Sequence, residues 1–176
     1  FDGSTWTEVN DMNSPRNGFA SNGTQTSALA FGGNPNPSRA VNESWNGTSW
    51  TETGDLNTGR RYIAGAGRQD SALGFGAGPT AIVKTERYNG TSWTETADMA
   101  IAQKNHGGAG LQAAALSCGG ESPTNSRFVT QEFNITANTV TAAAWSSGGN
   151  LNTARINAKG AGTQTAGVAF GGRPPD

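Results

Sequence analysis

One phrase recurs four times along this chain, and this repetition constrains the fold more than any other feature of the sequence. The copies read FDGSTWTEVNDMNSPR from Phe1, WNGTSWTETGDLNTGR from Trp45, YNGTSWTETADMAIAQ from Tyr88 and FNITANTVTAAAWSSGGNLNTAR from Phe133. They divide the chain into units 1–44, 45–87, 88–132 and 133–176, at a period of roughly 44 residues. The chain therefore repeats one small structural unit, and we expect the four units to form a single domain.

A second motif follows each copy and keeps a glycine and a glutamine at equivalent positions. The pairs are Gly23 and Gln25, Gly67 and Gln69, Gly110 and Gln112, and Gly162 and Gln164. This recurrence indicates that four equivalent backbone sites make the same conformational demand. The glutamines lie in predicted turns, where they either contact a ligand or satisfy loop carbonyls, and we favour the second interpretation.

The local patterns within each unit are typical of short strands. Ser27–Gly33 (SALAFGG) is an apolar run suited to a strand buried on both faces. Tyr62–Gly67 (YIAGAG) predicts a small-residue strand whose backbone packs close to others around a centre. Asn46–Gly47 predicts a type I′ hairpin turn between a strand ending at Glu43–Trp45 and one beginning at Ser49–Glu52. A sheet of four such strands cannot bury its own faces, so the sheets must stack around an axis.

These features resemble kelch repeats along the whole chain. The glycine doublets are Gly32–Gly33, Gly119–Gly120 and Gly171–Gly172; the third-strand aromatic residues are Phe1, Trp45, Tyr88 and Phe133; the fourth-strand tryptophans are Trp6, Trp50, Trp93 and Trp145. The resemblance implies an all-β fold, a small β-propeller of four kelch-like four-stranded blades in which these aromatic residues are structural. The NGTSWTE wording is also similar to kelch-like repeat arrays of phage structural and tail-associated proteins.

The phase of the repeat predicts how the ring closes. The chain begins at the end of a third strand, continues into a fourth (TWTEV), and ends after a second strand (GVAFGG). We expect the N-terminal strand to pair with the C-terminal strands, which removes the open edges. A larger ring shared between two chains, which would make the protein a homo-oligomer, and an excerpt of a longer array are the alternatives.

The best candidates for ligand binding precede the first strand of each unit: Arg16, Arg60, Gln103 and Arg155. In a propeller, equivalent positions converge around the axis, so these guanidinium groups are suited to a carboxylate or a sulfated or sialylated sugar at the channel mouth. The competing interpretation, to which we give more weight, is that each arginine bonds backbone carbonyls and neighbouring Asp residues and so holds adjacent blades together.

The residue types needed for metal binding or catalysis are scarce. His106 is the only histidine and Cys118 the only cysteine, whereas zinc and copper sites of ordinary type need more such ligands. Cys118 aligns with core positions of the other units, which favours a buried thiol. A sialidase-like hairpin is echoed at Ser44–Trp50, but Asn46 stands where that motif has an acid. We predict no catalytic residue, no metal and no cofactor, and a glycoside hydrolase is the least favoured alternative.

The net charge of the chain limits which partners it can bind. With 12 basic and 13 acidic residues, the net charge is −1, which is unsuited to holding a nucleic acid by its phosphates. No stretch of the sequence is apolar enough for a membrane span. We therefore expect a non-catalytic binding or structural module, extracellular or on a virion, that recognises glycans or envelope components. The alternative is an intracellular kelch-type adaptor that binds a protein.

Overall fold

The computed structural model describes residues 3–35, 40–78, 80–123, 128–135, 144–147, 151–153, 155–163 and 166–174. These residues form an all-β structure of antiparallel sheets. Within them, no helix has the length and apolar character that crossing a membrane requires. Phe1 and Gln164, two positions of the predicted repeat, lie outside the described residues.

Three sheets have four strands each, hydrogen-bonded in the order of the sequence, and a fourth sheet has two. Sheet 1 contains β1 (Ala20–Thr24), β2 (Ser27–Phe31), β3 (Asn42–Trp45) and β4 (Trp50–Thr53). Sheet 2 contains β5 (Ala64–Gly67), β6 (Ala72–Phe75), β7 (Thr85–Tyr88) and β8 (Trp93–Glu95). Sheet 3 contains β9 (Gly107–Leu111), β10 (Ala114–Cys118), β11 (Thr130–Asn134) and β12 (Ala144–Ser147), and sheet 4 contains β13 (Lys159–Thr163) and β14 (Ala166–Phe170).

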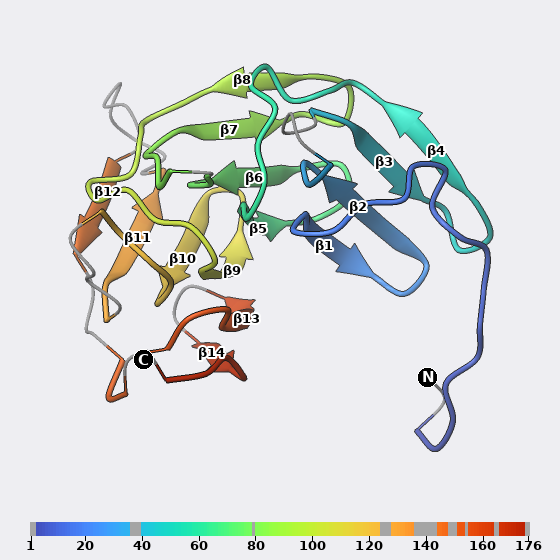
Figure 1. The fold of residues 1–176 in the computed structure, drawn as a ribbon. Helices are drawn as coiled ribbons and strands as arrows, with labels where there is room; N and C mark the ends of the chain where they lie inside the picture. The colour runs from blue at the N-terminus through green and yellow to red at the C-terminus, as the bar shows by residue number, and fades with distance from the viewer. Residues whose placement is uncertain are drawn as a thin grey trace.

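The four sheets lie side by side in an open arc, with the first strand of each sheet turned toward a common centre (Figure 1). These inner strands are successive neighbours: β1 packs beside β5, β5 beside β9, and β9 beside β13. The arc is open between sheet 4 and sheet 1 (Figure 1). The prediction of four short antiparallel strands per unit is therefore confirmed for sheets 1 to 3.

The inner strands approach one another so closely that glycine is required at their contacts. A Cβ atom added to Gly108 would lie 2.3 Å from the carbonyl oxygen of Gly65, and one added to Gly160 would lie 2.9 Å from that of Gly108. Distances this short leave no room for a side chain, since neither backbone can retreat without breaking its own ladder. The predicted crowding of small-residue strands around a centre is thus confirmed.

The hydrophobic core lies between successive sheets rather than inside any one of them. Phe31 of sheet 1 is 0% exposed, and its ring centroid lies 4.7 Å from that of Trp93 in sheet 2. Phe75 of sheet 2 occupies the equivalent place and packs in a second cluster with Phe133 of sheet 3. The apolar run at 27–33 is therefore buried as predicted, with Leu29 also 0% exposed.

The repeated aromatic residues differ in burial according to their place in the arc. Trp45, Tyr88 and Trp93 are buried, and the rings of Tyr88 and Trp93 lie 5.1 Å apart. Trp50, on the outer strand of sheet 1, is half-buried beside Trp45. Trp6 is 86% exposed, and Trp145 lies on β12, where its backbone pairs with that of Phe133. A structural role as expected from the repeat is thus visible for the buried members of the series.

The hairpin loops differ from the predicted type I′ turn. The strands end at the pair Trp45 and Trp50, so the loop has four residues, and Gly47 has a positive φ while Asn46 does not. The side chain of Asn46 instead accepts hydrogen bonds from the backbone N–H groups of Thr48 and Ser49, both at 2.9 Å. Asn89 does the same in sheet 2. Asparagine therefore favours this loop through its side-chain oxygen and not through a left-handed backbone.

Among the described residues, the predicted pairing of the N-terminal strand with the C-terminal strands is not seen. Residues 3–12 form no strand, and the segment is bound to sheet 1, where Asn10 Nδ2 donates to the carbonyl of Thr48 at 2.8 Å. Val168 and Phe170 of β14 are 62% and 53% exposed, whereas the equivalent Leu29 and Phe31 are fully buried. The apolar face of β14 that closure would cover is therefore accessible.

Replacing Phe31 with alanine should lower the free energy of unfolding by about 3–5 kcal/mol, because a fully buried ring is lost and a cavity remains. Phe170→Ala, at the equivalent position of sheet 4, should cost less than about 1 kcal/mol because that ring is largely exposed. Urea denaturation followed by tryptophan fluorescence measures both. Equal losses would contradict the assignment of the core to the contacts between sheets.

Candidate functional site

Arg16 and Arg60 lie directly before the inner strands of sheets 1 and 2, and each forms an ion pair inside its own sheet. Nη1 of Arg16 lies 3.1 Å from Oε1 of Glu43, and neither side chain is exposed. Nη2 of Arg60 donates to Oε1 of Glu86 at 2.7 Å, with 2% and 1% of the two side chains exposed. Burial lowers the pKa of Arg60, and the nearby Glu86 opposes that change.

These ion pairs connect the segment before the first strand of each sheet to the third strand, because Glu43 and Glu86 lie on β3 and β7. Arg60 Nη1 also donates to the carbonyl of Lys84 at 2.6 Å, so the guanidinium contacts the segment that leads into β7. The geometry agrees with the interpretation that the arginines are structural, but the partner is a glutamate of the same sheet and not an Asp of a neighbour. Neither guanidinium is exposed to a ligand.

Gln103 takes the arginine position in sheet 3, where a neutral network replaces the ion pair. Oε1 of Gln103 accepts a hydrogen bond from Gln131, which stands where Glu43 and Glu86 stand in the other sheets. It also accepts one from Ser117 Oγ at 3.0 Å, and Ser117 is bonded in turn to Nδ1 of His106 at 2.7 Å. His106 is 3% exposed, and burial lowers its pKa from 6.5 to about 3, which keeps the imidazole neutral.

Arg155, the fourth member of the series, is half-buried and donates from Nη1 to the carbonyl of Gly171 at 2.9 Å. Arg60 makes the corresponding contact with Gly76. The structure therefore places each predicted ligand-binding residue within its own sheet and does not bring the four together. Cys118 is also structural: it is 2% exposed, as the alignment with Phe31 and Phe75 predicts, and burial raises the pKa of its thiol.

The repeated glutamines join neighbouring sheets. Nε2 of Gln69, in the β5–β6 turn, donates to the carbonyls of Ala28 and Trp45 in sheet 1. Gln112, in the β9–β10 turn, donates in the same way to the carbonyls of Ala72 and Tyr88 in sheet 2. Both glutamines bond backbone carbonyls, as the preferred interpretation predicts, but the acceptors lie on strands of the neighbouring sheet and not in loops.

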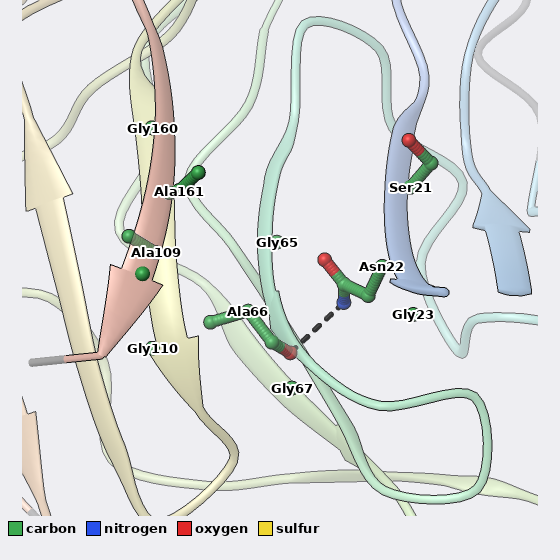
Figure 2. Close-up of a pocket in the computed structure, with 12 residues that line it drawn as sticks. Ser21, Asn22, Gly23, Gly65, Ala66, Gly67, Ala109, Gly110, Gly160 and Ala161 are labelled. Atoms are coloured by element: carbon green, nitrogen blue, oxygen red, sulfur yellow. Dashed lines mark hydrogen bonds between the residues drawn. The ribbon is translucent and has the colours of Figure 1, made fainter. Parts of the chain in front are cut away.

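A central pocket of about 310 Å³ lies between the four inner strands (Figure 2). Three residues of each strand line it: Ser21–Gly23, Gly65–Gly67, Gly108–Gly110 and Gly160–Gly162. Asn22 extends across it, and its Nδ2 donates to the carbonyl of Ala66 at 2.9 Å (Figure 2). Because nearly all the lining residues are glycine or alanine, the pocket presents mainly backbone groups and little side-chain chemistry.

The glycine that ends each triplet is fixed by its backbone. Gly23, Gly67, Gly110 and Gly162 have φ values of 118°, 109°, 105° and 109°. A Cβ atom on Gly67 would lie 2.2 Å from the carbonyl oxygen of Ser71, and the other three have an equivalent contact. Only glycine fits this conformation and this distance. The turns that follow Gly23, Gly67 and Gly110 therefore start from one backbone conformation, and Arg68 and Asp70, which differ from their equivalents, are exposed.

A second hollow of about 370 Å³ lies between the β1–β2 and β5–β6 turns and adjoins the central pocket through Gly23 and Gly67. Its polar side chains are Thr24, Ser27, Arg68, Gln69 and Asp70, which we call the turn site. Arg68 and Asp70 are exposed, and Ser27 Oγ donates to Gln69 Oε1 at 2.7 Å. The site thus combines a cation, an anion and hydroxyl groups within one open depression.

The turn site was missed by reasoning from the repeat, which directs attention to what the units share. The turns read Thr-Gln-Thr after Gly23, Arg-Gln-Asp after Gly67, Leu-Gln-Ala after Gly110 and Thr-Gln-Thr after Gly162. Only the second carries charges on either side of its glutamine. This departure from the repeat is the sequence signal that identifies Arg68 and Asp70.

Among the described residues, no three side chains of the His, Cys, Asp or Glu type lie together as metal ligands would. No protein-family model matches the sequence, and no curated protein matches it.

Changing Glu86 to glutamine should lower the free energy of unfolding by about 3–5 kcal/mol, because the buried Arg60 loses its counter-ion. Adding Arg60→Gln should restore a large part of that loss, since Gln103 and Gln131 form such a neutral pair in sheet 3. Lys84→Gln is the control: its ion pair with Glu95 is exposed and should contribute less than about 1 kcal/mol. Denaturant titration of the four proteins measures these values, and a double variant weaker than Glu86→Gln alone would refute the equivalence.

Lowering the pH from 7 to 5 should destabilise the protein by about 2 kcal/mol through His106. The folded imidazole, with a pKa of about 3, stays neutral over this range, while the unfolded chain takes up a proton below its ordinary pKa of 6.5. Stability is therefore lost as the pH falls through 6.5. Urea titrations at both pH values should show the loss in the natural protein and not in His106→Phe, which introduces the residue found at Phe19 of sheet 1. An equal loss in both proteins would contradict a buried neutral histidine.

Proposed function

We propose that the chain is a non-catalytic binding module on a kelch-like β-propeller scaffold and that it recognises a glycan at the turn site. The four-blade propeller is supported by the order of the strands within sheets 1 to 3, by the inner strands around one pocket, and by the glutamines that join successive sheets. In the closed ring, Gln25 would bond carbonyls of sheet 4 as Gln69 bonds those of sheet 1. The exposed side chain of Gln25 is consistent with that role.

The observation that carries the binding proposal is the pair of exposed charges in the β5–β6 turn. Arg16, Arg60, Gln69 and Gln112 make ion pairs or hydrogen bonds within or between the sheets, so these repeated groups serve the scaffold. Arg68 and Asp70 interrupt the repeat and lie at the rim of an open hollow. This departure from the repeat makes the β5–β6 turn the candidate for recognition.

The chemistry of the turn site suits a sugar. A guanidinium donates two parallel hydrogen bonds, and a carboxylate accepts two, so the pair can hold neighbouring hydroxyl groups in a fixed orientation. Thr24 and Ser27 add hydroxyl groups on the facing turn. The carboxylate or sulfate of an acidic sugar would pair with Arg68. We infer a role in adhesion, extracellular or on a virion, with glycans or envelope components as the partner.

A glycan array probed with the labelled protein tests this proposal. The matched variant is Arg68→Thr with Asp70→Thr, which gives the β5–β6 turn the Thr-Gln-Thr sequence that the same turn has in sheet 1. We expect binding to a defined group of glycans, weakened about tenfold or more in this variant through the loss of charge-assisted hydrogen bonds. Leu111→Ala, an exposed position in the equivalent turn of sheet 3, should leave binding unchanged. No binding on the array, or the same binding by the double variant, would refute the proposal.

A further inference from the structure

Sheet 4 ends at β14 in the part of the chain that the structure describes. One edge of β14 pairs with β13, and no described residue pairs with the other edge. In sheets 1 to 3, the corresponding edge of the second strand is always occupied by a third strand. A free edge of this kind exposes a row of backbone donors and acceptors to which an extended segment can bind.

Arg155 shows what chemistry that segment should carry. It is held to the carbonyl of Gly171 as Arg60 is held to that of Gly76, so its guanidinium takes the position from which Arg60 reaches Glu86. Among the described residues, no carboxylate forms an ion pair with Arg155, whereas Arg16 and Arg60 each have one on the third strand. The missing strand is therefore expected to supply an acidic group.

The residues around Arg155 distinguish glutamate from glutamine at that position. The second-strand residue opposite the third-strand acid is Ala30 in sheet 1 and Gly74 in sheet 2. In sheet 3, where the pair is Gln103 and Gln131, it is Ser117, whose hydroxyl bonds to Gln103. Sheet 4 has Ala169 at this position, and it has neither the serine nor the histidine of the neutral network. Sheet 4 therefore belongs to the arginine–glutamate type.

We propose that the free edge of β14 binds an extended segment, antiparallel, with a glutamate opposite Ala169 that pairs with Arg155. The register of sheet 1, where Glu43 faces Ala30 and Trp45 faces Ala28, places an aromatic residue of the segment opposite Gly167. The partner is thus a strand of the pattern glutamate, any residue, aromatic residue. This inference concerns the opposite end of the arc from the turn site and does not rest on glycan recognition.

A synthetic peptide of residues 84–96 (KTERYNGTSWTET), labelled at its N-terminus, is a suitable probe because it contains the third and fourth strands of sheet 2. Fluorescence anisotropy should show saturable binding to the full chain. Amide chemical shifts of the ¹⁵N-labelled chain should change along Ala166–Phe170. Absence of binding up to millimolar peptide, or shifts confined to sheets 1 to 3, would overturn the proposal.

Paired substitutions separate the ion pair from general attraction between the peptide and a basic surface. The peptide with Glu86→Ala, and the chain with Arg155→Gln, should each lower the affinity at least about 30-fold, as expected for the loss of one partner of a desolvated ion pair. The Glu86→Gln peptide should bind Arg155→Gln better than the natural peptide does, because the two amides reproduce the pair of sheet 3. Arg173→Gln, an exposed arginine near the same edge, is the control and should change affinity less than twofold. Equal weakening by Arg155→Gln and Arg173→Gln would overturn the assignment of Arg155.

Discussion

The contact between an aromatic ring of one sheet and the glycines of the next is the interaction on which the rest of this structure depends. The ring of Phe31 fills the position that a side chain on Gly65 would take, and the ring of Phe75 does the same at Gly108. Each sheet buries its apolar face only by lying on its neighbour, because a single sheet of four short strands has no second layer. The hydrophobic effect therefore acts between repeats, and the arc is the form in which all of them can take part.

Polar residues that recur in each unit add specificity to this packing. The Arg16–Glu43 and Arg60–Glu86 pairs fix the entry of the chain to the third strand within a sheet, and Gln69 and Gln112 fix one sheet to the next. Buried charges are costly when unpaired, so each of these groups constrains its partner as well as itself. Sheet 3 shows that the same place accepts a neutral network when all its members change together. Gln103, Gln131, Ser117 and His106 are joined by hydrogen bonds, so a change at one of these buried positions affects the partners of the others.

Residues that depart from the repeat stand apart from this framework. Arg68 and Asp70 change only the exposed side chains of a turn whose backbone is set by Gly67, so they add chemistry without disturbing the fold. Arg155 keeps the repeat but has no carboxylate partner among the described residues, which marks the edge of sheet 4 as incomplete. Arg68 and Asp70 differ from their equivalents in residue type, whereas Arg155 differs from its equivalents in the residues around it. The two proposed binding sites therefore concern opposite ends of the arc.

Much of the local structure was predictable from the sequence, because repetition shows which positions meet the same physical demand four times. The short strands, the crowded inner glycines and the buried run at Leu29–Phe31 follow from local pattern and size. The hairpin loop was predicted only in part. The glycine indicates a positive φ, but the sequence does not show that Asn46 acts through its side chain. The role of Arg68 and Asp70 required the structure, which shows that their turn borders a hollow shared with Thr24 and Ser27.

The sequence by itself determined an all-β chain of repeated short strands whose sheets must pack on one another. The reason is that residue spacing and side-chain size are local properties, which can be read directly from the sequence. Only the tertiary structure shows which residues form ion pairs with the arginines. The partner of Arg60 is Glu86, a residue on a strand two positions across the sheet, and the ion pair forms because the strand register brings them to 2.7 Å. It also decided that the N-terminal segment lies on sheet 1, so that no described strand pairs with the outer edge of β14. Both outcomes depend on distances between segments far apart in the chain, which local sequence pattern does not contain.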